Sequence, residues 1–203
     1  SPHSSRPGLT SRIDREIDHA KQGYRAMMTL KCNNLVDRQL TMKLYEASQA
    51  GVEIRLIVRG TCSLLPGVKG ISENIEAISI IDRYLEHPRV YVFHNRGEPE
   101  YLLGSADLMT RNIDYRVEVL CPITDAAVQG QLQDILDQQW HDNVKARVLD
   151  GEQSNRLRAR GKATPTLQSQ ETIHRYLTSG KKPRMPRSLM KRASRRRRSP
   201  QVR

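Results

Sequence analysis

The residues that could do chemistry in this sequence begin with a histidine just before a short apolar run. His87 is followed two positions later by Arg89, and residues 89–94 read as a β-strand, so both side chains can point to the same side of the pleat. A histidine that titrates near neutral pH can attack phosphorus or protonate a leaving oxygen. A basic neighbour offsets the charge on phosphoryl oxygens. The pair fits phosphoryl-transfer chemistry, but its spacing alone favours a surface histidine before a strand.

A second polar group follows where the next strand pattern ends. Residues 101–105 read as a strand that leads into the turn Gly104-Ser105-Ala106-Asp107. A His-x-basic pair followed by a Gly-Ser-x-Asn/Asp turn is the pattern of phospholipase D-like phosphotransfer sites. We therefore expect Arg89, Ser105 and Asp107 to support a reaction at His87.

Three arginines offer further contacts to phosphate. Arg59 ends the best-defined strand and precedes Gly60 and a long loop, where a guanidinium can make a bidentate phosphate contact. Arg111 and Arg116 flank Asp114 and could form a phosphate clamp oriented by that carboxylate. A surface ion pair for Arg59 and a solvated turn for the other two fit the sequence equally well. No Walker loop and no Gly-x-Gly-x-x-Gly run occurs, so neither device would hold a nucleotide.

Alternating strand and helix patterns are expected to position these side chains. Apolar spacing predicts a helix over residues 8–22 and a strand over 27–31. Asn33 and Asn34 are candidate caps of the next helix, which Gly51 ends. A strand over 52–59 follows. Strand, helix and strand in so short a stretch predict a parallel βαβ unit and so an α/β fold.

The second half of the chain shows the same kinds of pattern. Residues 60–75 are turn-rich and predict a loop, and residues 75–85 predict a helix. Strands are expected over 89–94, 101–105 and 115–123, with Val117, Val119 and Cys121 on one side of the last. Helical spacing over 125–141 predicts a helix packed on the sheet. A polar linker over 150–166 then leads to a last helix around 167–177.

The formal charge of +12 is concentrated at the carboxyl end. Residues 181–203 hold eleven basic residues and no acidic one, which leaves only +1 on residues 1–180. We therefore divide the chain into a domain over 1–180 and a basic tail over 181–203 that is expected to be disordered. Such a tail attracts any polyanion, nucleic acid included, without specificity. A plain solubilising extension is the alternative.

Composition excludes several classes of protein. Hydrophobic residues make up 37% of the 203 residues, enough for one ordinary core. No apolar run is long enough for a transmembrane helix, and the first residues lack the apolar stretch of a secretory signal. Cys32, Cys62 and Cys121 are isolated and outside metal-ligand spacing, so we expect reduced thiols in a cytoplasmic protein. The chain does not start with Met, and we expect it to be part of something longer.

Beyond these local patterns, several runs in order resemble the carboxyl-terminal catalytic domain of the polyphosphate kinases, which polymerise the terminal phosphate of ATP. The resemblance covers about residues 8–180 and does not extend to the arginine-rich tail. The runs that carry it are Leu30–Asp37 (LKCNNLVD), Val58–Leu64 (VRGTCSL), Gly70–Ile75 (GISENI), Arg83–His87 (RYLEH) and Ser105–Asp114 (SADLMTRNID).

In that family two phospholipase D-like domains face each other, and each contributes one His-x-basic motif. The resemblance therefore implies a phospholipase D-like sandwich domain with a mixed sheet flanked by helices. The resemblance implies that His87 is the catalytic histidine of the second motif and assists transfer at the nucleotide end. It also implies that Arg59 and Arg116 bind ATP phosphate, with Arg111 in support. The histidine that becomes phosphorylated belongs to the preceding domain and has no match here. We therefore expect the carboxyl-terminal part of a longer enzyme, with half an active site.

The resemblance also implies what the protein works with. We expect ATP or ADP and inorganic polyphosphate as substrates, Mg²⁺ with the nucleotide but without ligands in this chain, and a homo-oligomer in the complete enzyme. Two alternatives stay open, which are a phospholipase D-like phosphodiesterase or nuclease and a non-catalytic polyanion-binding fragment. The enzymatic interpretation requires His87 and Arg59 to lie on one side of the molecule, in a pocket for a tri- or polyphosphate.

Overall fold

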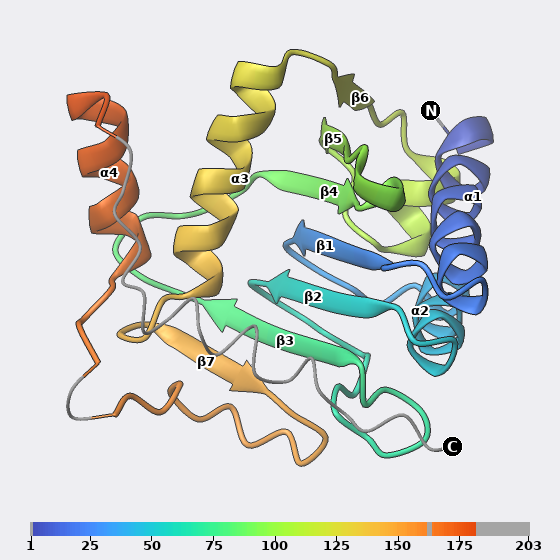
Figure 1. Ribbon diagram of the computed structural model, residues 1–203, viewed down its shortest axis with the longest axis horizontal. Helices are drawn as coiled ribbons and strands as arrows, with labels where there is room; N and C mark the ends of the chain where they lie inside the picture. Colours follow the sequence, from blue (N-terminus) through green and yellow to red (C-terminus); the bar gives the residue numbers. More distant parts are fainter. Residues whose placement is uncertain (1, 162–163, 182–203) are drawn as a thin grey trace.

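A mixed β-sheet lies between two pairs of helices in the computed structural model, which describes residues 2–161 and 164–181 (Figure 1). The strands are β1 (Met27–Cys32), β2 (Glu53–Val58), β3 (Ile75–Ile80), β4 (Arg89–Phe93), β5 (Glu100–Gly104), β6 (Leu120–Ile123) and β7 (Ala146–Leu149). The helices are α1 (Pro2–Lys21), α2 (Arg38–Gln49), α3 (Ala126–Trp140) and α4 (Ser169–Ser179), with a 3-10 turn over Asn95–Gly97 and a π-helical turn over Arg111–Tyr115. Apart from Lys181, the expected tail lies outside the described residues.

The strand directions bring all the predicted site residues to one end of the sheet. The strand order is β6-β5-β4-β1-β2-β3-β7. Strands β1, β2 and β3 are mutually parallel, while β4 is antiparallel to β1, β5 to β4, β6 to β5 and β7 to β3. The carboxyl ends of β1, β2, β3 and β5 therefore lie beside the amino ends of β4 and β6. We call this end of the sheet the carboxyl edge.

Each face of the sheet carries its own hydrophobic core. Leu30 and Leu56 belong to the cluster that packs against α1 and α2. Ile57 and Val90 belong to the cluster that includes Trp140 of α3 on the opposite face. Figure 1 shows α1 and α2 together on one side of the sheet and α3 with α4 on the other. Because each fully buried aliphatic side chain contributes roughly 1.5–3 kcal/mol, the two cores hold the carboxyl edge on a rigid support.

The α/β fold and most of its elements are as the sequence predicts, but the helix expected over residues 75–85 is wrong. Residues 75–80 form the inner strand β3, between β2 and β7, and residues 81–88 cross the carboxyl edge to β4. Ile75 is buried in the core next to α1 and α2, and Ile78 in the core next to α3. A strand buried on both faces has no polar alternation, so its apolar run resembles part of a buried helix.

Other differences concern where elements begin. α1 starts at Pro2 rather than at residue 8. The N-cap of α2 is Asp37, whose carboxylate accepts a hydrogen bond from the Leu40 amide, rather than Asn33 or Asn34. The strand expected over 115–123 is limited to β6, and the preceding Val117 is 87% exposed. Strand β7, which the sequence analysis does not predict, pairs antiparallel with β3.

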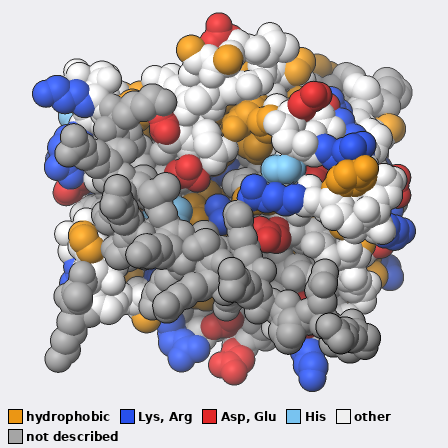
Figure 2. All heavy atoms as spheres, in the orientation of Figure 1, with side chains coloured by type: hydrophobic (Ala, Val, Ile, Leu, Met, Phe, Trp, Pro, Cys, Tyr) orange, Lys and Arg blue, Asp and Glu red, His pale blue; other side chains and the backbone are white. Residues whose placement is uncertain are grey.

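The described surface mixes charges of both signs. Figure 2 shows acidic side chains next to basic ones and to histidine on the face that it presents. This mixture agrees with the formal charge of +1 that remains on residues 1–180 when the basic tail is set apart. Among the described residues, no helix has the length and apolar character needed to cross a membrane.

Candidate functional site at the carboxyl edge

The buried carboxylate of Asp107, just after β5, is the centre of the site. Its Oδ1 accepts hydrogen bonds from the backbone N–H of Asn33 at 2.7 Å and from Arg89 Nε at 3.2 Å. Its Oδ2 accepts from Arg89 Nη2 at 3.2 Å and from Asn34 Nδ2 at 3.3 Å. Burial alone raises the pKa of Asp107, but these donors outweigh burial and hold the pKa below its ordinary value. The carboxylate therefore joins the ends of β1, β4 and β5.

Arg59, directly after β2, joins this group through Asn33. Arg59 Nε donates to Asn33 Oδ1 at 2.9 Å, while Asn33 Nδ2 lies 3.3 Å from Asp107 Oδ1. The close approach requires Gly60, because a Cβ there would lie 2.9 Å from the Asn33 carbonyl oxygen and 2.7 Å from Asn34 Oδ1. The Nη atoms of Arg59 have no hydrogen-bond partner among the described residues. They are available to an oxyanion.

His87 lies in the segment 81–88 that crosses the same edge. Its backbone oxygen accepts a hydrogen bond from Arg89 Nη1 at 3.0 Å. The ring is exposed and makes no hydrogen bond to another described residue. The preceding residue, Glu86, is held by Lys31 Nζ at 2.8 Å, by Gln170 Nε2 at 3.2 Å and by Gln139 Nε2. The backbone at His87 is thus fixed, while its imidazole is free to meet a substrate.

The structure places His87 and Arg59 at the same edge, whereas the pocket that the enzymatic interpretation expects around them stays a prediction, because neither residue lines the hollow along α2. A chain of hydrogen bonds runs from the His87 carbonyl oxygen through Arg89, Asp107 and Asn33 to Arg59. Arg89 donates to a carboxylate with its Nε and Nη2 and to a carbonyl with its Nη1, so its role here is to support the edge. The roles of His87 and Arg59 toward a substrate stay predictions.

Ser105 supports the turn after β5. Its Oγ donates to the carboxylate of Glu118 and accepts from the Val119 amide at 3.2 Å. The same carboxylate accepts from Asn112 Nδ2 at 2.6 Å. A Cβ at Gly104 would lie 2.1 Å from the Val119 carbonyl oxygen, so only glycine fits there. The Ser105 hydroxyl is therefore already hydrogen-bonded within the protein, both as a donor and as an acceptor.

The phosphate clamp predicted around Arg111 and Arg116 lacks its expected carboxylate. Both arginines are exposed, and neither guanidinium has a hydrogen-bond partner in the part of the chain that the structure describes. Asp114 instead accepts from Arg6 of α1, at 2.8 Å from Nε and 2.6 Å from Nη2. The two arginines are thus available for phosphate, but nothing orients them as the sequence analysis expects.

Arg6 also holds the loop that precedes α2. Its Nη1 and Nη2 donate to the two oxygens of Asp37 at 2.8 and 2.7 Å, and Thr110 Oγ1 donates to the same carboxylate at 2.7 Å. The hydrogen bond from Arg6 is the main cause that lowers the pKa of Asp37 to about 2, with help from the Leu40 amide and Thr110. Arg6 thereby links α1, the carboxyl edge and the turn that carries Arg111.

We expect acid to destabilise the protein partly through Asp37. Because the pKa of Asp37 is lower in the folded protein, at about 2, than its ordinary 3.8, the unfolded state binds the proton first. This contribution to stability is present above about pH 4 and is lost as the pH falls toward about 2. In thermal melts from pH 6 to 2, the melting temperature of Asp37→Asn, which keeps a cap residue, should fall less than that of the wild-type protein. Equal slopes of melting temperature against pH for the two proteins would contradict this expectation.

Several residues of the site were missed or misassigned in the sequence analysis. The sequence predicts Asn33 as a candidate helix cap, but its side chain contacts both Asp107 and Arg59. Lys31 and Glu86, which fix the backbone before His87, were not singled out. A lysine inside the apolar strand MMTLKC is a usable signal, because a buried ammonium group requires an acidic partner.

The described residues do not fit a resident metal ion. They contain no group of three or more His, Cys, Asp and Glu side chains that could hold one. The carboxylates of the carboxyl edge are instead occupied by hydrogen-bond donors from Arg89, Arg6, Ser105 and other residues. We therefore derive no step from a metal bound to this chain.

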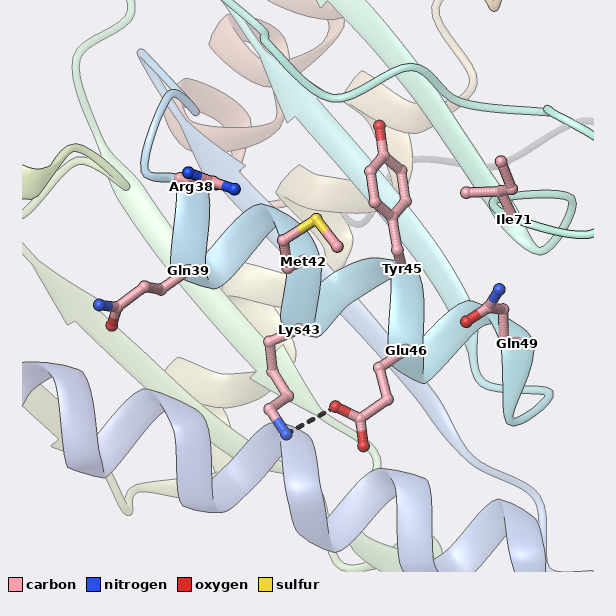
Figure 3. A pocket seen from close by; sticks show the side chains of 8 residues that line it. All are labelled: Arg38, Gln39, Met42, Lys43, Tyr45, Glu46, Gln49 and Ile71. Carbon is pink, nitrogen blue, oxygen red and sulfur yellow. Dashed lines mark hydrogen bonds and ion pairs between the residues drawn. The ribbon is translucent and has the colours of Figure 1, made fainter.

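A surface hollow of about 850 Å³ lies along α2, and none of the predicted site residues lines it. Figure 3 shows Lys43 and Glu46 at its rim, joined by an ion pair of 2.8 Å, with Met42 and Tyr45 nearby on the same helix. Its other lining residues are Arg38, Gln39, Gln49 and Ile71. We assign no part of the site to it.

The mixed sheet and its flanking helices confirm the α/β fold that the sequence predicts. NucT from Helicobacter pylori shares the fold with a TM-score of 0.51 and 13% identity, over 68% of this chain and 91% of that one. A family model described as polyphosphate kinase C-terminal domain 2 matches residues 1–170, and the chain belongs to this family.

Relatives from several bacteria agree with this assignment. Polyphosphate kinase from Vibrio vulnificus is 54% identical over 182 residues, and that from Escherichia coli K12 is 50% identical over 183 residues. The crystal structure of polyphosphate kinase from Porphyromonas gingivalis matches with a TM-score of 0.83 and 41% identity over 86% of this chain. Each match covers about 90% of this chain or slightly less, but only 26% of the relative.

Proposed function

We propose that this chain forms part of the active site of a cytoplasmic polyphosphate kinase, which reversibly transfers the terminal phosphate of ATP to inorganic polyphosphate. One observation supports this beyond family membership. The unpaired Nη atoms of Arg59 and the free imidazole of His87 lie at the same edge, and a hydrogen-bond network through the buried Asp107 and Asn33 joins Arg59 Nε to the His87 backbone oxygen. A cationic donor and a group that can transfer protons are what cleavage of a phosphoanhydride bond needs.

In the proposed reaction the bond between the terminal phosphorus of ATP and its bridging oxygen breaks. A bond from that phosphorus to a ring nitrogen of a histidine outside the described residues forms, so that this histidine becomes a phosphohistidine. The bridging oxygen leaves with the electron pair as part of ADP. His87 donates a proton or a hydrogen bond to that oxygen. Arg59 and Arg116 neutralise the phosphate chain, with Arg111 as a further cation. In the next step the phosphoryl group passes to the polyphosphate end.

Under this proposal the protein binds ATP or ADP as the magnesium complex, so Mg²⁺ arrives as part of the substrate. We further propose a homo-oligomeric complete enzyme in which a second phospholipase D-like domain faces the carboxyl edge. Nucleic acid would bind only through the basic residues 181–203, without sequence specificity.

The test is to supply the intact protein with ATP labelled at the terminal phosphate and with polyphosphate, and in parallel with DNA and a small phosphodiester. Growth of labelled polyphosphate, and formation of ATP from ADP and polyphosphate, is the expected result. Cleavage of the diesters without chain growth would show a hydrolase instead. Removal of residues 181–203 should leave the transfer in place, whereas loss of all polyphosphate binding with the tail would favour the polyanion-binding alternative.

A further inference from the structure

We propose that Asn33 is a positioning residue that sets the direction of the Arg59 guanidinium toward the phosphate chain of the substrate. The inference builds on the proposed function, because it concerns the arginine that the proposed function assigns to phosphate binding. It rests on the hydrogen bonds around a side chain that is only 2% exposed.

The side-chain amide of Asn33 lies between the Asp107 carboxylate and the Arg59 guanidinium, and these two neighbours fix its orientation. Its Nδ2 lies 3.3 Å from Asp107 Oδ1, and its Oδ1 lies 2.9 Å from Arg59 Nε. An amide has donors on one side and an acceptor on the other. Since a carboxylate can only accept and a guanidinium can only donate, the amide fits these neighbours in one orientation alone.

The backbone of Asn33 is equally constrained. Its side-chain amide therefore cannot follow the Arg59 side chain if the arginine moves. The Asn33 amide N–H donates to Asp107 at 2.7 Å, and its carbonyl oxygen accepts from the Gly60 N–H at 2.7 Å. The acceptor offered to Arg59 Nε therefore has a fixed position. The guanidinium plane is anchored at Nε, and both Nη groups remain for a bidentate contact to oxyanions.

A neutral partner orients Arg59 without cancelling its charge. Arg89, in the same network, is paired directly with the Asp107 carboxylate, so its charge is largely balanced within the protein. Arg59 meets the carbonyl oxygen of an amide instead, and its full positive charge stays available to a phosphate chain. An aspartate at position 33 would neutralise Arg59 and would also repel Asp107.

A double-mutant cycle in the intact protein tests this. Asn33→Ala should lower kcat/KM for ATP about tenfold, mainly through KM, because Arg59 loses the acceptor that aligns it. In an Arg59→Ala background the same substitution should have less than about a twofold further effect. Additive losses in the two backgrounds would overturn the inference.

Asn34→Ala is the matched control. Asn34 also donates to Asp107, at 3.3 Å, but its Oδ1 accepts from the Thr61 amide rather than from Arg59. Any loss of kcat/KM that Asn34→Ala causes should be the same in the wild-type and in the Arg59→Ala background. Thermal melts of all variants separate this positioning effect from a change in stability, which should not depend on Arg59.

A spectroscopic readout keeps the test independent of activity. In the full chain labelled with ¹⁵N, the Arg59 Nε–H signal should be protected from exchange, and it should lose that protection in Asn33→Ala but keep it in Asn34→Ala. Unchanged protection in Asn33→Ala contradicts the inference. If the wild-type protein transfers no phosphate although this signal behaves as expected, the proposed function fails while the placement of Arg59 by Asn33 stands. Weaker binding of tripolyphosphate by Asn33→Ala would then support this placement.

Discussion

Replacement of His87 by alanine in the intact protein should lower the rate of phosphoryl transfer about 100-fold or more, because loss of a proton-transfer group typically has that effect. The fold should be unaffected. The ring is exposed and makes no hydrogen bond to another described residue, so its removal should change the free energy of unfolding by less than about 0.5 kcal/mol. Turnover with ATP and polyphosphate, measured beside thermal melts, checks both statements.

Two further variants show whether the loss comes from the imidazole at this position. His87→Gln can still donate a hydrogen bond but cannot exchange a proton near neutral pH, so it should lose nearly as much activity as alanine. His174→Ala removes another exposed histidine, on α4, and should leave turnover unchanged. Normal turnover in His87→Ala would remove this residue from the mechanism.

The fold was predictable where each element has a pattern of its own. The alternation of Glu53 and Arg55 with buried neighbours identifies β2, and the turn after it marks the end of the βαβ unit. The failure at β3 has a physical cause, because a strand covered on both faces shows no alternation. Strand β7 was missed because only four residues pair with β3, too few to show a period.

The site was predictable in its residue types but not in its contacts. Arg59, His87 and Asp107 stand out because they follow or precede strands whose ends meet at one edge. Which donor faces which carboxylate depends on residues far apart in sequence. Arg6 and Asp114 are 108 positions apart, and no local pattern couples them. The same holds for Asn33, whose contacts become visible only when β2 is paired with β1 and β5 is placed beyond β4.

The largest effect on stability should come from removing the Asp107 carboxylate. Asp107→Ala would leave the largely buried Arg89 guanidinium, 12% exposed, without its carboxylate partner, and would also leave the Asn33 backbone N–H without an acceptor. Breaking a buried ion pair from one side typically costs about 3–5 kcal/mol, because an uncompensated charge remains inside. Urea unfolding of the full chain should show a loss of this order.

The comparison variants are chosen to separate the loss of the pair from the loss of a carboxylate in general. Asp150→Ala removes the carboxylate of a more exposed pair with Arg156, 3.7 Å apart, together with its hydrogen bonds from Ser154, and should destabilise the protein clearly less than Asp107→Ala does. Asp107→Ala combined with Arg89→Met should recover part of the loss, since the stranded charge is gone. If Asp107→Ala costs no more than Asp150→Ala, the carboxylate does not hold the edge, and the alignment of Arg59 through Asn33 would have to come from another source.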